Sequence, residues 1–156
     1  MPVPFARLSW DLLEISPPGQ DEEKGLVVIV CECTHYAWIY PYYSKTAEEI
    51  AWCLYLTILD AGVVPWSLRS DRGSEFRNQV IAELAFCLGM LPVYSAALHA
   101  RSNGRVERAN REVIRFLAAN VQTTLERTWD SWPDWVPLLQ HHLRHRPLKA
   151  DPRVTP

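Results

Sequence analysis

Apolar and polar residues alternate along the first part of the chain in the pattern of β-strands. Residues 6–15 alternate with a period of two, so that Leu8, Trp10 and Leu12 share one face. Residues 26–31 form a short apolar run rich in β-branched side chains, which predicts a buried strand. Between them lies a polar segment containing Pro-Pro-Gly, which predicts a hairpin loop.

The aromatic segment around Pro41 predicts a third strand, because proline cannot donate a backbone hydrogen bond and is tolerated at a sheet edge. The spacing then changes to that of a helix. Ile50, Leu54 and Ile58 recur at intervals of four, and Gly62 stands where a helix ends. The remaining elements are expected at 64–70 (strand), 75–88 (helix), 91–95 (fifth strand), from about 104 (long helix) and 129–147 (a helix whose start Pro133 and Pro137 disturb).

This order of elements predicts one α/β domain with a five-stranded mixed sheet flanked by helices. The chain has 156 residues, of which 48% are hydrophobic and 22% charged, a composition typical of a folded domain with its own core. Its apolar runs are too short to span a bilayer, so we expect no membrane partner. The net charge of −2 means that any nucleic-acid contact has to come from a local basic patch.

The four cysteines are scattered through apolar surroundings, which favours reduced, buried thiols over a zinc site. That interpretation predicts an intracellular protein. It rests on Cys31, Cys33, Cys53 and Cys87.

Three carboxylates are candidates for chemistry: Asp11 in the first strand, Asp71 directly after the fourth, and Glu107 at the start of the long helix. Strand ends and helix starts are where open sheets collect ligands. If the three side chains converge, a hard divalent cation such as Mg²⁺ or Mn²⁺ is needed to offset their repulsion. Each also has a structural explanation: a strand-edge Asp facing water, an Asp that caps the next helix, and a Glu on a solvated helix face.

Three motifs carry a family resemblance. W-D in the first strand, SDRGSEF at 70–76 and SNGRVERANR at 102–111 occur in order, and 35 residues lie between Asp71 and Glu107. This pattern resembles the D,D-35-E motif of retroviral and retrotransposon integrase catalytic cores, and the similarity covers essentially the whole chain. It implies a ribonuclease H-like fold. We therefore expect residues 1–156 to be an integrase catalytic core taken from a longer chain.

The resemblance implies a two-metal mechanism in which Asp11 bridges two Mg²⁺ or Mn²⁺ ions and Asp71 and Glu107 each complete one site. The activity implied is trimming of DNA 3′ ends and their transfer to target DNA. Glu75, four residues after Asp71, is expected to support the ligands without binding a metal.

A basic stripe on the long helix is expected to bind DNA, because Arg108, Arg111 and Arg115 recur at steps of three and four. The full set of nucleic-acid-binding candidates is Asn103, Arg105, Arg108, Asn110, Arg111 and Arg115. The partners implied by the resemblance are element-end DNA, target DNA and a second copy of the core, with the nucleus as the site of action on chromosomes. Two alternatives stay open: a domesticated core that only binds DNA or protein, and a ribonuclease H-like nuclease without joining activity.

Overall fold

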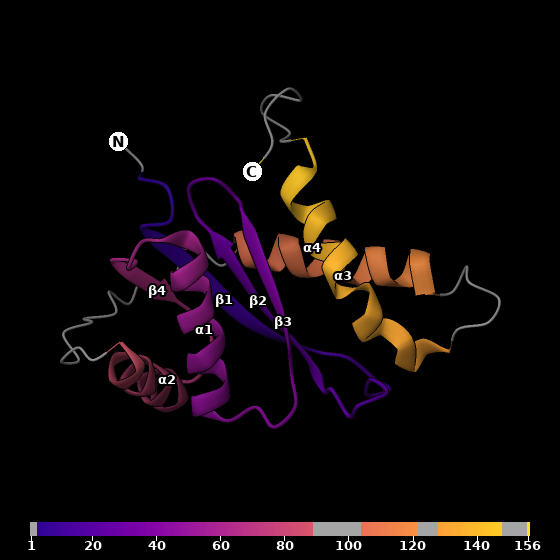
Figure 1. The fold of residues 1–156 in the computed structure, drawn as a ribbon, viewed down its shortest axis with the longest axis horizontal. Coiled ribbons are helices and arrows are strands. Elements are labelled where there is room, and N and C mark those ends of the chain that lie inside the picture. The colour runs from indigo at the N-terminus through magenta and orange to yellow at the C-terminus, as the bar shows by residue number, and fades with distance from the viewer. Residues whose placement is uncertain (1–2, 89–103, 122–127, 148–155) are drawn as a thin grey trace.

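A computed structural model of the chain describes residues 3–88, 104–121, 128–147 and 156. In this part of the chain, four strands form a mixed sheet in the order β3-β2-β1-β4 (Figure 1). The β1–β2 and β2–β3 pairs are antiparallel and the β1–β4 pair is parallel. The strands are β1 (Arg7–Glu14), β2 (Gly25–Cys31), β3 (Ala37–Tyr42) and β4 (Ser67–Arg69).

Helices cover both faces of the sheet, which gives three layers (Figure 1). One face packs against α1 (Ala47–Ala61) and α2 (Ser74–Cys87), and its core is centred on Trp10, Trp38 and Leu54. The other face packs against α3 (Gly104–Val121), the 3-10 helix η1 (Trp129–Trp135) and α4 (Val136–His145).

The alternation of β1 decides which layer each of its side chains meets. Leu8, Trp10 and Leu12 belong to the core beneath α1 and α2, as their shared face in the sequence predicted. Since successive strand residues point to opposite faces, Asp11 lies on the face covered by α3, as does Leu13, which packs against the second core. The strand therefore directs a carboxylate toward the long helix.

Several boundaries agree with their sequence signals. Gly62 caps α1 with a left-handed φ of 67°, which glycine adopts without the penalty that a Cβ imposes. The last segment is a 3-10 helix that contains Pro133, followed by an α-helix with a proline in its first turn. The sequence predicted five strands, and the described residues contain four. The expected fifth strand, at 91–95, lies outside the described residues.

β3 is an edge strand, as Pro41 indicated, and α4 covers its free side. The Gln140 side-chain oxygen accepts the backbone N–H of Ile39 at 2.9 Å, and Arg144 Nε donates to the backbone carbonyl of Ala37 at 2.9 Å. Gln140 and Arg144 are one helical turn apart, so one face of α4 satisfies both outward-facing backbone groups. We call these two side chains the edge clamp. None of the described helices combines the length and apolar character needed to cross a membrane.

Candidate active site

Asp11 sits on β1 with a side chain that is 25% exposed and surrounded by donors. The backbone N–H of Leu12 donates to its Oδ1 at 2.8 Å, and Asn110 Nδ2 from α3 donates to its Oδ2 at 3.0 Å. Arg72 Nε lies 3.2 Å from Oδ1. A carboxylate in this position would be costly to bury alone, and these partners offset that cost. The alternative interpretation, an Asp that faces water at the edge of the sheet, does not describe this side chain.

Arg72 reaches Asp11 from the turn between β4 and α2. Its Nη2 donates to the backbone carbonyl of Leu12, and the backbone N–H of Arg72 donates to Ser70 Oγ at 3.2 Å. The buried Nε makes no hydrogen bond, so its contact with Asp11 is electrostatic. Sequence reasoning missed this residue: the signal available was a cation inside the SDRG motif, but the sequence does not reveal which way a turn side chain points.

Asp71 and Glu107 occupy the expected elements and are both exposed. Asp71 lies between β4 and α2, and Glu107 lies in the first turn of α3, which packs against β1. Within the described ranges, no three carboxylate, imidazole or thiol side chains are close enough together to hold a metal ion. The shared metal site of Asp11, Asp71 and Glu107 therefore stays a prediction. The donor chemistry fits a hard divalent cation, because all three groups offer carboxylate oxygens.

The residues expected to bind DNA divide into two sets. Arg108, Arg111 and Arg115 are exposed on α3, opposite the buried stripe formed by Val113 and its neighbours. Arg105 instead donates to the backbone carbonyl of Glu32, and Asn110 turns toward Asp11 with its own Oδ1 buried and lacking a hydrogen-bond partner. Asn103 lies outside the described residues, and Glu75 is exposed in the first turn of α2.

Positive charge gathers around the start of α3. Burial lowers the pKa of His35, and the charges of Arg105, Arg146 and Arg108 lower it further. Burial also lowers the pKa of Arg146, with a further contribution from Arg108. Each effect arises from cations that lie close to one another at the start of α3, in the β2–β3 turn and at the end of α4, where Arg146 is also paired with Glu112. Such a region attracts phosphate groups.

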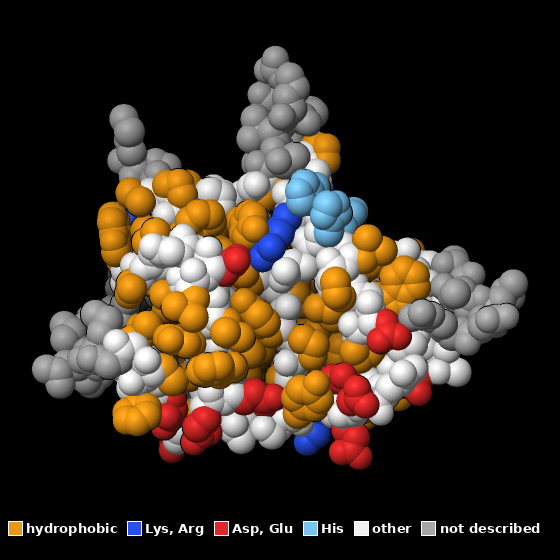
Figure 2. All heavy atoms as spheres, viewed as in Figure 1, with side chains coloured by type: hydrophobic (Ala, Val, Ile, Leu, Met, Phe, Trp, Pro, Cys, Tyr) orange, Lys and Arg blue, Asp and Glu red, His pale blue; other side chains and the backbone are white. Residues whose placement is uncertain are grey.

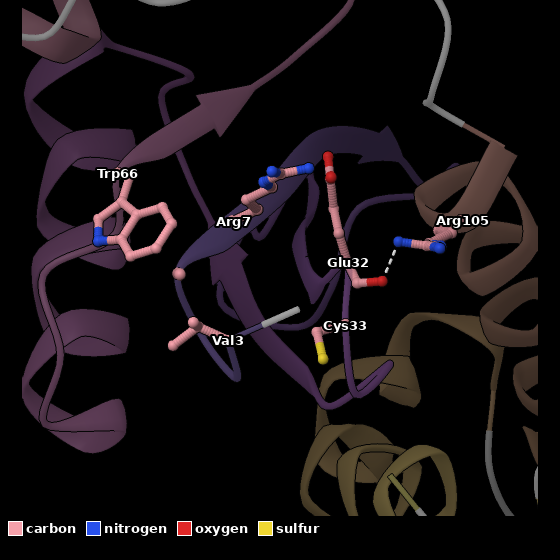
Figure 3. A pocket seen from close by; sticks show the side chains of 7 residues that line it. Val3, Arg7, Glu32, Cys33, Trp66 and Arg105 are labelled. Atoms are coloured by element: carbon pink, nitrogen blue, oxygen red, sulfur yellow. Dashed lines mark hydrogen bonds between the residues drawn. The ribbon is translucent and has the colours of Figure 1, made fainter. Parts of the chain in front are cut away.

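A cavity of about 440 Å³ lies beside this basic region (Figure 3). Arg7, Trp66 and Arg105 line it, with Glu32 between the two arginines. Glu32 is 6% exposed. Its Oε1 accepts a hydrogen bond from the Ser9 hydroxyl at 2.8 Å and lies 3.4 Å from Arg69 Nη1 in an ion pair. Sequence reasoning missed this buried carboxylate. The available signal was a charged residue between two cysteines at the end of an apolar run.

Comparison with known proteins decides the family. Residues 2–100 match the model of the integrase core domain. The chain belongs to the integrase core domain family. It is 32% identical over 137 residues to the Gag-Pol polyprotein of feline leukemia virus, which is 88% of this chain and 8% of the polyprotein. It is 30% identical over 137 residues to the Pro-Pol polyprotein of simian foamy virus type 3, covering 88% of this chain and 11% of that protein.

The retrovirus-related Pol polyprotein from transposon 412 of Drosophila melanogaster is 26% identical over 129 residues, which is 82% of this chain and 10% of the polyprotein. The chain thus spans about a tenth of the length of these curated relatives.

Solved integrase cores share the fold. The HTLV-2 integrase catalytic core in complex with magnesium (dimeric form) superposes with a TM-score of 0.68 at 16% identity, covering 97% of this chain and 94% of that one. The BIV integrase catalytic core gives a TM-score of 0.64 at 21% identity, covering 91% and 85%. These likenesses show that the chain has the α/β fold of integrase catalytic cores.

Proposed function

We propose that this chain is the catalytic core of a retroelement integrase, a polynucleotidyl transferase that trims DNA 3′ ends and joins them to target DNA. The observation that carries the proposal is the Asp11 carboxylate, held on β1 by donors from α3 and from the turn after β4. Those are the two elements that carry Glu107 and Asp71. Membership of the integrase core domain family supports the same chemistry.

In this proposal Asp11, Asp71 and Glu107 hold divalent metal, as magnesium in the HTLV-2 core suggests. When bound, a pair of such ions activates the attacking oxygen and stabilises the leaving 3′ oxygen. Asn110 orients Asp11 through Oδ2, and the Leu12 N–H fixes Oδ1. The chain then needs no nucleophile of its own, because water or a DNA 3′-hydroxyl attacks the phosphorus.

DNA binding is assigned to the exposed arginines of α3. Arg108, Arg111 and Arg115 lie on the solvent face of the helix that also carries Glu107, so a phosphate backbone bound along them passes the carboxylates. The cations around His35 extend this surface toward α4. Because the contacts are to phosphate, we expect binding with little sequence preference and a strong dependence on salt.

Gel assays with Mn²⁺ and labelled element-end DNA test the function, with Asp71→Asn as the inactive variant. Products longer than the substrate indicate joining, and shorter products alone indicate a nuclease. A substrate that mimics the joined product tests the reverse reaction, which we expect to depend least on segments outside the core. If the chain binds DNA but Mn²⁺ and Asp71→Asn make no difference to any substrate, the domesticated binding module replaces this proposal.

We also propose that two copies of the core associate. The outer side of α1 exposes Trp52 and Leu59, which are 53% and 58% exposed, and apolar side chains gather on that face of the molecule (Figure 2). Exposed apolar patches of this kind mark interaction surfaces. The HTLV-2 core is described as dimeric in one form and trimeric in another. Sedimentation of the wild type against Trp52→Glu tests it: a monomeric variant supports the face, and unchanged association excludes it.

A further inference from the structure

We propose that Arg72 and a divalent ion compete for the Asp11 carboxylate, so that Arg72 lowers the affinity of the site for metal. This inference rests on the proposed function, in which Asp11 is a metal ligand. It assigns a role to a residue between the SD of the motif and Gly73 that neither the carboxylate motif nor the basic stripe predicts.

The contacts around Asp11 leave little room for a cation. Its Oδ1 accepts the Leu12 N–H at 2.8 Å and lies 3.2 Å from Arg72 Nε, while Oδ2 accepts Asn110 at 3.0 Å. A carboxylate offers about four lone-pair positions; the two hydrogen bonds use one on each oxygen, and the Arg72 guanidinium lies against Oδ1 without a hydrogen bond. Arg72 therefore stands on one side of Oδ1 where a metal ligated by that oxygen would have to share the space.

Charge gives a second reason for competition. The guanidinium neutralises the carboxylate of Asp11 on a site where both side chains are largely screened from water, 31% and 25% exposed. A divalent ion on the same oxygen would stand within a few ångströms of that guanidinium, and like charges at that distance repel strongly. The two cations therefore compete for one carboxylate.

A purely structural role for Arg72 makes a different prediction. The bond from its Nη2 to the Leu12 carbonyl ties the turn after β4 to β1, and loss of that tie alone destabilises the fold without tightening metal binding. Arg77 provides a matched control. Its Nη1 donates to the Ser70 carbonyl at 3.2 Å, so it anchors the same turn, but among the described residues Asp11 forms its ion pair with Arg72 and not with Arg77.

The test is calorimetric titration of Mn²⁺ into the wild type, Arg72→Gln, Arg77→Gln and Asp11→Asn. We expect Arg72→Gln to bind Mn²⁺ about two- to fivefold more tightly, as the loss of a partly exposed ion pair predicts. Arg77→Gln should match the wild type and Asp11→Asn should lose affinity. If Asp11→Asn weakens binding but Arg72→Gln does not tighten it, the competition is wrong and the metal site stands. If Asp11→Asn binds as the wild type does, the metal role of Asp11 fails and the inference fails with it.

A measurement on the wild type avoids any dependence on how the variants fold. In an NMR titration with Mg²⁺, the Arg72 Nε–Hε signal should move in step with the backbone amide of Leu12, which reports on Asp11 Oδ1. The Arg77 Nε–Hε signal should stay in place. An Arg72 signal that remains fixed while the Leu12 amide shifts to saturation overturns the proposal.

Discussion

The start of α1 offers a prediction whose magnitude follows from the contacts. Thr46 caps the helix, its hydroxyl accepting the Glu49 N–H at 3.3 Å. The Glu49 carboxylate reaches back and accepts three backbone N–H groups, those of Tyr43 at 2.7 Å, Ser44 at 2.9 Å and Lys45 at 3.0 Å. The arrangement resembles a capping box, except that the carboxylate accepts the N–H groups of the three residues before the N-cap and not that of Thr46. It satisfies backbone donors that no helical carbonyl can reach.

We expect Glu49→Gln to lower the free energy of unfolding by about 1–2 kcal/mol. Loss of a cap costs roughly 0.5–2 kcal/mol, and the neutral amide keeps one acceptor oxygen but replaces the other with donors that face donors. For a chain of this size, each kcal/mol lowers Tm by about 2–4 °C. Thermal unfolding followed by circular dichroism, together with urea unfolding at 25 °C, measures both quantities.

The pH dependence gives the sharper test. Burial raises the pKa of Glu49, but the bonds from Tyr43, Ser44 and Lys45 outweigh it and hold the pKa below the ordinary value of 4.5. Because the folded pKa is lowered, this stabilisation is present above pH 4.5 and is lost as the pH falls through the folded pKa. The difference between wild type and Glu49→Gln should therefore shrink in acid.

Glu48 is the matched control, since it is exposed in the same first turn of α1. Its charge favours the helix dipole by about 0.3–1 kcal/mol, so Glu48→Gln should cost less than Glu49→Gln. Equal costs for the two variants, or a Glu49→Gln deficit that persists unchanged at pH 3, would show that the capping contacts do not contribute as described.

Three further predictions follow from differences in burial and from hydrogen bonding. Gln140→Leu should cost about 1–3 kcal/mol in urea unfolding, because the Ile39 N–H loses its acceptor, and a stability equal to wild type would contradict this. Iodoacetamide should label the exposed Cys87 in the native protein and the buried Cys53 only after unfolding, as mass spectrometry can determine. Burial raises the pKa of the Cys53 thiol from 9.0 to about 12. Its contribution is complete below pH 9 and falls as the pH rises from 9 to 12, so Cys53→Ala should flatten the alkaline loss of stability in that range.

The pattern of apolar and polar residues predicted those parts of the fold that depend on local periodicity and on local backbone chemistry. The intervals of four from Ile50 to Ile58 and the glycine at 62 define α1, and Pro41 indicated an edge strand because a missing N–H limits where a strand can sit. The inward set on α3, including Val113 and Leu117, also follows from periodicity. The exposure of Cys87 was not foreseen, since α2 has a weakly segregated sequence in which apolar composition does not decide the buried face.

The candidate site was predictable in its residue types and less so in its contacts. The motifs selected Asp11 and Asn110, but the hydrogen bond that Asn110 donates to Asp11 was not predicted. The pairing of Arg72 with Asp11 was not accessible, since 60 positions separate Arg72 from Leu12, whose carbonyl it also meets. Contacts between distant segments depend on side-chain direction, which periodicity does not encode.

The edge clamp on β3 has a consequence for how copies of this core can meet. With the N–H of Ile39 and the carbonyl of Ala37 already engaged by α4, an incoming strand would find those two ladder positions taken. A continuous sheet running through two molecules at β3 would require α4 to detach first. Assembly at this side of the molecule is thereby confined to side-chain packing between intact domains, and α4 also protects the strand from templating fibrous aggregates.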